Sequence, residues 1–126
     1  NLKLMNNLDS EGCLKRLCQT KLSLNVMPWF KDGAHDRIFN TMLNGAVCLT
    51  DGSTYLNEIL HSNEDCAIYS LAQMEKLPEI ASALLADPDR MQRIADGGDR
   101  LAQAGHTWAH RAQTLHELVE REAAGE

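Results

Sequence analysis

The residues between Phe30 and Arg37 combine acidic, basic and glycine positions between two apolar segments. Asp32 can accept hydrogen bonds from sugar hydroxyls, while His35 and Arg37 can add positive charge beside a pyrophosphate. Gly33 would allow a ligand to approach the backbone closely. A helix that starts at this turn offers free amides and the positive end of its dipole, which suits a phosphate. The segment therefore indicates a site for an anionic ligand that also carries hydroxyl groups.

The same segment also has a purely structural interpretation. Gly33 can end a strand, Asp36 can cap the following helix, and Arg37 can be solvated or paired with Asp36. Two further acids, Asp51 and Glu58, are expected at the same place, because ligand sites in parallel sheets lie outside the carboxyl ends of the strands. Spacing alone leaves both interpretations open.

Apolar segments that alternate with helical patterns predict the fold. The predicted strands are residues 2–5, 21–29, 46–50 and 66–69. Segment 46–50 lacks polar alternation, which is typical of a strand buried on both faces. From residue 70 onward every pattern is helical. The order predicts an α/β fold, with a Rossmann-like parallel sheet of about four strands flanked by helices and a helical C-terminus.

Local signals predict the ends and buried faces of the helices. Asp9 or Ser10 is expected to cap the first helix, and Gly45 is expected just after the helix that follows the turn. Ser70 and Gln73 have the spacing of a capping box. Two glycines, Gly97 and Gly98, are expected to weaken the helix that starts at Pro88. In the last helix the residues predicted to be buried are Trp108, Ala112, Leu115 and Val119.

Composition limits the classes of function. A chain of 126 residues suits one domain, and a net charge of −6 argues against a nucleic-acid surface. No apolar run approaches the ~20 residues that cross a bilayer. Four scattered cysteines predict reduced thiols in a cytoplasmic protein, with Cys13 and Cys18 buried. His106 and His110 lie four residues apart but are expected to be solvated, so no metal site is predicted.

The order of motifs resembles the C-terminal half of GT-B glycosyltransferases, in particular the group-1 and spore-coat-type enzymes. The similarity covers nearly the whole chain and is carried by NVMPWFKDGAHDRIFNTMLNGAVCLTDGSTYLNEIL and LLADPDRMQRIADGGDRLAQAGHTWAHRAQTLHEL. In that family a loop leads to a helix that ends in a small-residue–Gly step. A buried strand ending in Asp follows, and a helix of the "hTw..R" kind closes the domain.

The resemblance implies transfer of a sugar from a nucleotide-diphosphate donor without a redox cofactor. Such enzymes often bear two glutamates, and Asp32 and Asn40 stand at their positions here. Asp32 keeps a carboxylate, and Asn40 keeps hydrogen-bonding capacity without the charge. The resemblance and the turn chemistry together give the predicted donor-binding residues, which are Asp32, Gly33, Ala34, His35, Arg37, Asn40, Asp51 and Glu58.

The family half-domain begins with further strand–helix units, so residues 1–126 are expected to be part of a GT-B C-terminal domain from a longer chain. The acceptor-binding N-terminal domain is then an expected partner, and the fragment alone is expected to be inactive. A non-catalytic α/β module that dimerises through an open sheet edge is the alternative, with segment 2–5 pairing with a second copy. A receiver-like phosphoacceptor domain is a third candidate, but the chain lacks the paired acids near its start.

Overall fold

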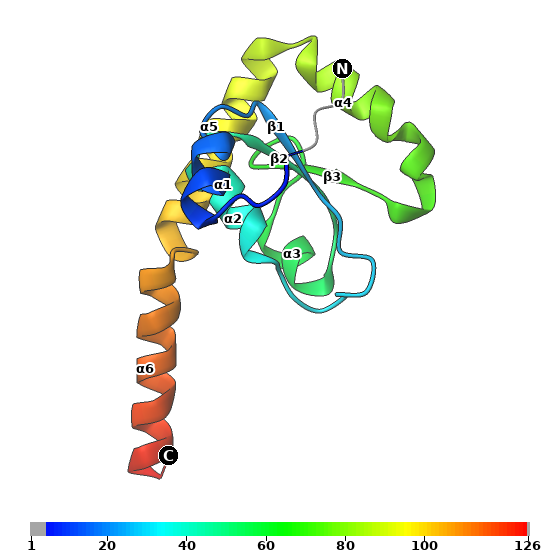
Figure 1. Ribbon diagram of the computed structural model, residues 1–126. Coiled ribbons are helices and arrows are strands. Elements are labelled where there is room, and N and C mark those ends of the chain that lie inside the picture. The colour runs from blue at the N-terminus through cyan, green and yellow to red at the C-terminus, as the bar shows by residue number, and fades with distance from the viewer. Residues whose placement is uncertain (1–4, 126) are drawn as a thin grey trace.

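A parallel sheet lies at the centre of the protein in the computed structural model, which describes residues 5–125 (Figure 1). The strand order is β1–β2–β3, and the strands are Leu22–Asn25, Val47–Asp51 and Ala67–Tyr69. All five residues of β2 are buried, which confirms the prediction for this segment. The predicted strand at residues 2–5 lies outside the described residues except for Met5, which is not in a strand.

Helices surround the sheet and form the C-terminal part of the chain, which confirms the predicted α/β class. In chain order they are α1 (Ser10–Leu17), α2 (Asp36–Leu43), α3 (Thr54–Ile59), the 3-10 helix η1 (Leu71–Lys76), α4 (Leu77–Leu85), α5 (Pro88–Gly105) and α6 (Trp108–Ala124). α6 extends away from the rest of the molecule (Figure 1). Among residues 5–125 no helix has the length and apolar character that crossing a membrane requires.

Two apolar clusters cover the two faces of the sheet, because successive residues of β2 point to opposite sides. Cys48 belongs to the cluster that includes Ile38 of α2. Leu49 belongs to the other cluster, together with Ile94 of α5. Burial raises the pKa of the Cys48 thiol to about 12, so Cys48 acts as a neutral core side chain. α5 and α2 are thus both anchored on the central strand.

Most predicted helix ends are confirmed. The Asp9 carboxylate caps α1 by accepting from the Gly12 amide at 2.8 Å. Gly45, with φ of +71°, follows α2 in the left-handed conformation that ends a helix. The capping box at Ser70 was wrong, because its side chain makes no cap hydrogen bond and Gln73 has the non-helical angles φ −130° and ψ 37°. A 3-10 helix replaces the predicted α-helical start.

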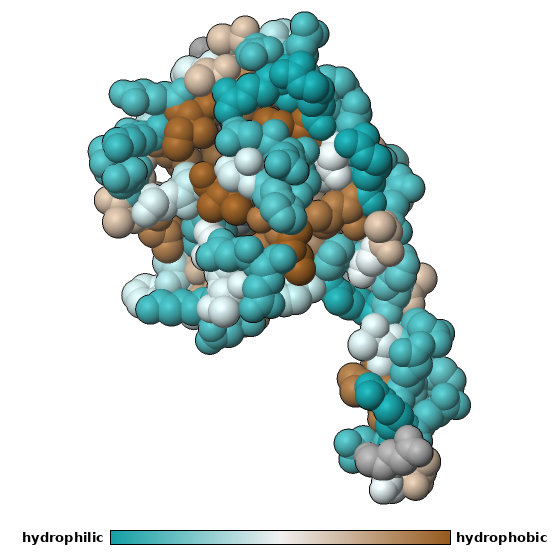
Figure 2. Space-filling view, turned by 180° about the vertical axis from the view of Figure 1, so that it is seen from behind, coloured by the Kyte–Doolittle hydropathy of each residue, from teal (hydrophilic) through white to brown (hydrophobic). Residues whose placement is uncertain are grey.

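The predicted buried stripe of α6 was wrong. Trp108, Leu115 and Val119 are 73%, 63% and 59% exposed, and no described residue of α6 is buried. Figure 2 shows apolar side chains on this helix at the surface, between polar ones. The pattern was helical as predicted, but within residues 5–125 no other element packs over it. The predicted burial of Cys13 and Cys18 was also wrong, because α1 has no buried residues and both thiols are exposed.

The glycine pair in α5 marks a close contact and does not break the helix. α5 runs without interruption from Pro88 to Gly105. A Cβ at Gly97 would lie 1.9 Å from the carbonyl oxygen of Glu64, and one at Gly98 would lie 2.6 Å from that of Asp65. The two glycines therefore let α5 rest directly on the turn before β3, and the predicted weak point was wrong.

We expect Gly97→Ala to destabilise the protein by roughly 1 to 3 kcal/mol, because the new methyl group meets backbone atoms that cannot move aside. Helix propensity alone would favour alanine by about 1 kcal/mol, so the sign of the change separates the two effects. Urea unfolding followed by circular dichroism measures it. Gly105→Ala is the matched control, because nothing lies within 4 Å of that position. A Gly97→Ala protein as stable as this control would contradict the close contact.

Candidate functional site

A groove of about 550 Å³ lies between the loop after β1, one side of α2 and the junction of α5 and α6. Its first wall contains four residues that the sequence predicted, namely Asp32, Gly33, Ala34 and Asn40. Its second wall contains residues from later in the chain, namely Tyr55, His106, Thr107, Trp108 and Arg111. The loop after β1 and Tyr55, in the first turn of the helix that follows β2, both line it, so the groove lies at the carboxyl edge of the sheet.

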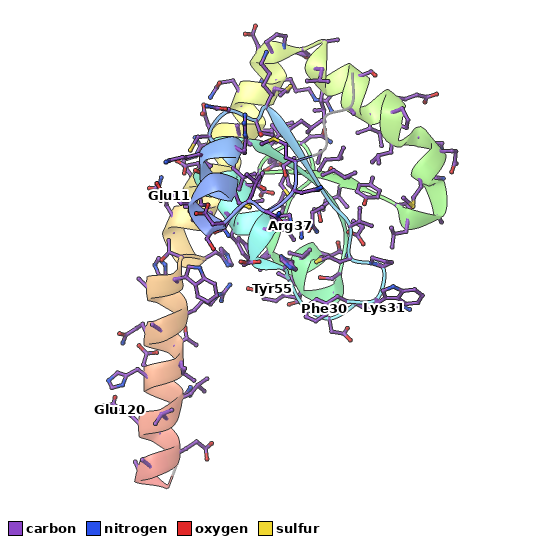
Figure 3. All side chains as sticks on the ribbon, viewed as in Figure 1. Glu11, Phe30, Lys31, Arg37, Tyr55 and Glu120 are labelled. Atoms are coloured by element: carbon purple, nitrogen blue, oxygen red, sulfur yellow. The ribbon has the colours of Figure 1, made fainter. Side chains whose placement is uncertain are left out.

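The loop after β1 is exposed at one end of the molecule. Figure 3 shows Phe30 and Lys31 of this loop at the same end as Tyr55, whereas Glu120 lies near the far end of α6. A Cβ at Gly33 would lie 2.4 Å from Cε1 of Phe30. The sequence hypothesis was that a ligand packs closely against the backbone of Gly33. In the structure the ring of Phe30 packs there.

Hydrogen bonds from the loop after β2 hold the first wall of the groove. The Ser53 hydroxyl donates to the Gly33 carbonyl oxygen at 2.6 Å, and the Thr54 hydroxyl donates to Oδ1 of Asp32 at 3.0 Å. The Thr54 amide also donates to the Lys31 carbonyl oxygen at 2.8 Å. The carboxylate of Asp32 is exposed, and within residues 5–125 no hydrogen bond engages its Oδ2. This oxygen can therefore accept a hydrogen bond from a ligand hydroxyl.

The start of α2 differs from the predicted phosphate cradle. Nδ1 of His35 accepts a hydrogen bond from the Arg37 amide at 3.1 Å and so caps the helix with the chain's own side chain. The same nitrogen lies 2.7 Å from Oδ1 of Asp36, a contact that becomes a hydrogen bond only if Nδ1 carries the proton. The two contacts therefore exclude each other, because the first needs Nδ1 without a proton and the second needs Nδ1 with one. Neither His35 nor Arg37 lines the groove, whereas Asp36 does.

Asp51 and Glu58 do not line the groove either. Asp51 is 1% exposed, and its carboxylate oxygens both accept from the Met27 amide, at 2.9 and 3.0 Å. This buried contact ties the start of the loop after β1 to the end of β2. Glu58 is exposed on α3. Asp51 therefore positions the loop, and neither side chain lies in contact with the groove.

A cluster around Arg111 forms the second wall. The sequence analysis did not predict this cluster as part of the site. Nη2 of Arg111 donates to the Tyr55 hydroxyl at 3.0 Å and lies 2.8 Å from Nδ1 of His106. The His106 ring stacks on Phe39 with centroids 4.6 Å apart and an angle of 1° between the planes. Cζ of Arg111 lies 5.8 Å from the centre of the Phe39 ring. Arg111 is thus held in a fixed orientation by three side chains.

The protonation state of His106 supports this arrangement. Burial, and then the positive charges of Arg111 and His110, lower the pKa of His106 below 6.5. At neutral pH the imidazole is therefore uncharged, and its Nδ1 can accept a hydrogen from Arg111. Nδ1 of His110 lies 2.7 Å from the Thr107 hydroxyl. The two histidines of the last helix region thus have separate partners, and residues 5–125 contain no group of three potential metal ligands.

The family assignment follows from comparison with known proteins. A family model described as glycosyl transferase-like matches residues 1–117 of the chain. The chain belongs to this family. No curated protein sequence matches this glycosyl transferase-like chain.

Solved structures show which fold this glycosyl transferase-like chain has. Sucrose-phosphate synthase from Thermosynechococcus elongatus is similar with a TM-score of 0.69 and 17% identity, over 82% of this chain and 26% of that one. The C-terminal domain of a group 1 family glycosyl transferase from Francisella tularensis is similar with a TM-score of 0.62 and 14% identity, over 85% of this chain and 53% of that one. The fold is that of a GT-B C-terminal domain, as predicted.

We expect Asp51→Asn to destabilise the protein by about 1 to 3 kcal/mol, because it replaces one of the two buried acceptor oxygens that share the Met27 amide with an NH2 donor group. Urea unfolding measures the change. Glu58→Gln removes the same charge from an exposed position and is expected to change the stability by less than about 0.5 kcal/mol. Equal stability of the two variants would contradict a positioning role for Asp51.

We expect an NMR titration of the His106 ring to give a midpoint below pH 6.5. Because the folded state then binds the proton more weakly than the unfolded state, the contribution of His106 to stability is present above pH 6.5 and is lost as the pH falls below it. Arg111→Gln should raise the midpoint only in part, since burial is the larger cause. A midpoint above 6.5 in the unaltered protein would show that the stacked, partly buried geometry is wrong.

Proposed function

We propose that this chain binds the nucleotide-diphosphate sugar of a glycosyltransferase and that the complete enzyme transfers the sugar to an acceptor. The observation that carries the proposal is the groove at the carboxyl edge of the sheet, whose first wall contains the loop predicted to hold the donor. Membership of the glycosyl transferase-like family supports the same class of reaction. No cofactor is needed, because the donor itself carries the activated sugar.

Two side chains of the first wall suit the hydroxyl groups of such a donor. Asp32 has one carboxylate oxygen free of protein partners within residues 5–125, and carboxylates are strong acceptors for sugar hydroxyls. Within residues 5–125 the Asn40 side chain makes one hydrogen bond, from Nδ2 to Oδ2 of Asp36 at 3.5 Å, so its Oδ1 is available as an acceptor. Gly33 and Ala34 line the same groove. We assign Asp32 to the sugar and Asn40 to the ribose of the donor.

The complete reaction needs parts beyond this wall. In sugar transfer an acceptor hydroxyl attacks the anomeric carbon, and the nucleoside diphosphate leaves with the bonding electrons. We propose that this chain positions the donor and that an N-terminal domain supplies the acceptor site and a base, since the chain spans only 26% and 53% of the two similar structures. Four free cysteines support a reducing, cytoplasmic location for such an enzyme.

The alternative proposal, a non-catalytic module that dimerises through the sheet edge, is not favoured by the family match. β1 has a strand partner on one side only within residues 5–125, and Leu24 is 46% exposed there. This edge fits a further strand of the same domain as well as a second copy. A homodimer therefore stays a prediction, which sedimentation at increasing protein concentration would test.

We expect UDP or GDP, and the corresponding nucleotide sugars, to shift the backbone NMR signals of Gly33, Ala34 and Asn40 at millimolar concentration. Asp32→Asn should lower the affinity for the nucleotide sugar by about 5- to 10-fold, because a charged acceptor for a sugar hydroxyl is replaced by a neutral one. The affinity of the same variant for the nucleoside diphosphate should be almost unchanged, since that ligand lacks the transferred sugar.

The matched control for this titration is Asp89→Asn, which removes one negative charge from the exposed first turn of α5. Its affinity for the nucleotide sugar should equal that of the unaltered protein. Absence of any ligand-dependent shift at Gly33 to Asn40 would count against donor binding by this chain. If Asp32→Asn lowers the affinity for both ligands equally, Asp32 does not contact the transferred sugar.

A further inference from the structure

Arg111 places a guanidinium in the second wall of the groove, and within residues 5–125 it has no carboxylate partner. Among the described residues no Asp or Glu oxygen lies within 4.0 Å of its guanidinium. Its hydrogen-bond partners are the Tyr55 hydroxyl and Nδ1 of His106, and the lowered pKa of His106 leaves that ring uncharged at neutral pH. In a chain of net charge −6 this leaves one positive charge of the groove without compensation from a neighbouring acid.

The geometry leaves donors of Arg111 available to a ligand. Both contacts to protein atoms are made by Nη2. A guanidinium has further N–H groups on Nε and Nη1, which lie in one plane and form a fork that matches the oxygens of a phosphate. No hydrogen bond within residues 5–125 engages these groups. Because the His106 ring stacks on Phe39, the nitrogen that contacts the Arg111 guanidinium is held in a fixed position.

The other charged groups of the groove lie on the opposite wall and are acidic. Asp32 and Asp36 line that wall, while the two cations that the sequence singled out, His35 and Arg37, are outside the groove. A phosphate placed against the first wall would meet carboxylates. In a nucleotide-diphosphate sugar the phosphates lie between two groups that carry hydroxyls, the ribose and the transferred sugar. Such a ligand can turn its phosphates toward Arg111 and its hydroxyls toward the first wall.

We propose that Arg111 binds the diphosphate of the nucleotide donor and that Tyr55 and His106 are positioning residues for its guanidinium. This inference rests on the proposed function and deepens it, because it moves the phosphate contact from the start of α2 to the start of α6. The hydroxyl groups of the donor then face Asp32 and Asn40 across the groove.

Titration with inorganic pyrophosphate tests the inference directly. We expect pyrophosphate to shift the side-chain Nε–Hε signal of Arg111 and the backbone signals of His106 and Thr107. Arg111→Gln should lower the affinity for pyrophosphate by about 10-fold or more, the usual scale for a charge-assisted bidentate contact. Arg111→Lys keeps the charge without the fork and should lie between the two. Because Arg111 is exposed, these variants are expected to fold normally.

The matched control is Arg121→Gln, which removes the same charge from the same helix ten residues further on, about 15 Å away along the helix axis. Its affinity for pyrophosphate should match that of the unaltered protein. Equal affinities for Arg111→Gln and Arg121→Gln would overturn the inference, since the effect would then be one of overall charge.

Tyr55→Phe tests the positioning role. We expect this variant to keep the urea unfolding midpoint while the order parameter of the Arg111 Nε–Hε bond falls, because the hydroxyl that holds Nη2 is gone. The affinity for pyrophosphate should fall by roughly 2- to 5-fold, because the guanidinium loses one of its two supporting contacts and keeps the other. An unchanged order parameter with unchanged affinity would remove Tyr55 from the assignment.

The two proposals can fail separately. If pyrophosphate binds at Arg111 but no nucleotide sugar shifts Gly33 or Asn40, the anion contact stands and the donor-binding function fails. If nucleotide sugars bind and Arg111→Gln leaves their affinity unchanged, the function stands and the Arg111 contact is wrong.

Discussion

The groove depends on a set of buried polar contacts that join the three strands at their carboxyl ends. Asp51 accepts from the Met27 amide with both carboxylate oxygens, at 2.9 and 3.0 Å. Asn25 donates to the Thr50 hydroxyl at 3.0 Å, and the Tyr69 hydroxyl donates to the Asn25 carbonyl oxygen at 3.0 Å. Burial makes each of these contacts expensive to break. The loop that forms the first wall therefore leaves β1 from a fixed point.

Charge is separated across the groove, and this separation limits what it can bind. One wall carries Asp32 and Asp36, and the other carries Arg111 with the uncharged ring of His106. A simple anion or a simple cation would satisfy one wall and leave the other unpaired. A ligand with separate polyol and phosphate parts matches both walls, as a nucleotide sugar does. The polarity of the groove thus agrees with the proposed class of ligand.

Features that depend on neighbouring residues in the chain could be predicted from the sequence. The unbroken apolar run of 46–50 predicted a buried strand, and Gly45 has the φ of +71° that ends a helix. The loop with Asp32, Gly33 and Ala34 was also placed at the carboxyl edge of the sheet, because α/β order alone brings it there.

Features that depend on distant residues could not be predicted in this way. Arg111 and Tyr55 are 56 positions apart, and no spacing rule joins them. The apolar pattern of α6 predicted burial, yet a pattern reports only that a face is apolar and not that another element covers it. His35 was read as a charged ligand contact because its use as a helix cap depends on the rotamer, which the sequence does not reveal.

The close contact between Gly97 of α5 and the turn at Glu64 bears on the position of the second wall. Gly97 rests on the carbonyl oxygen of Glu64, and the helix then runs rigidly for about 12 Å to its end at Gly105. The residues beyond that end are those that face α2. The turn at Glu64 therefore supports the helix that leads to the second wall, although Glu64 itself does not line the groove.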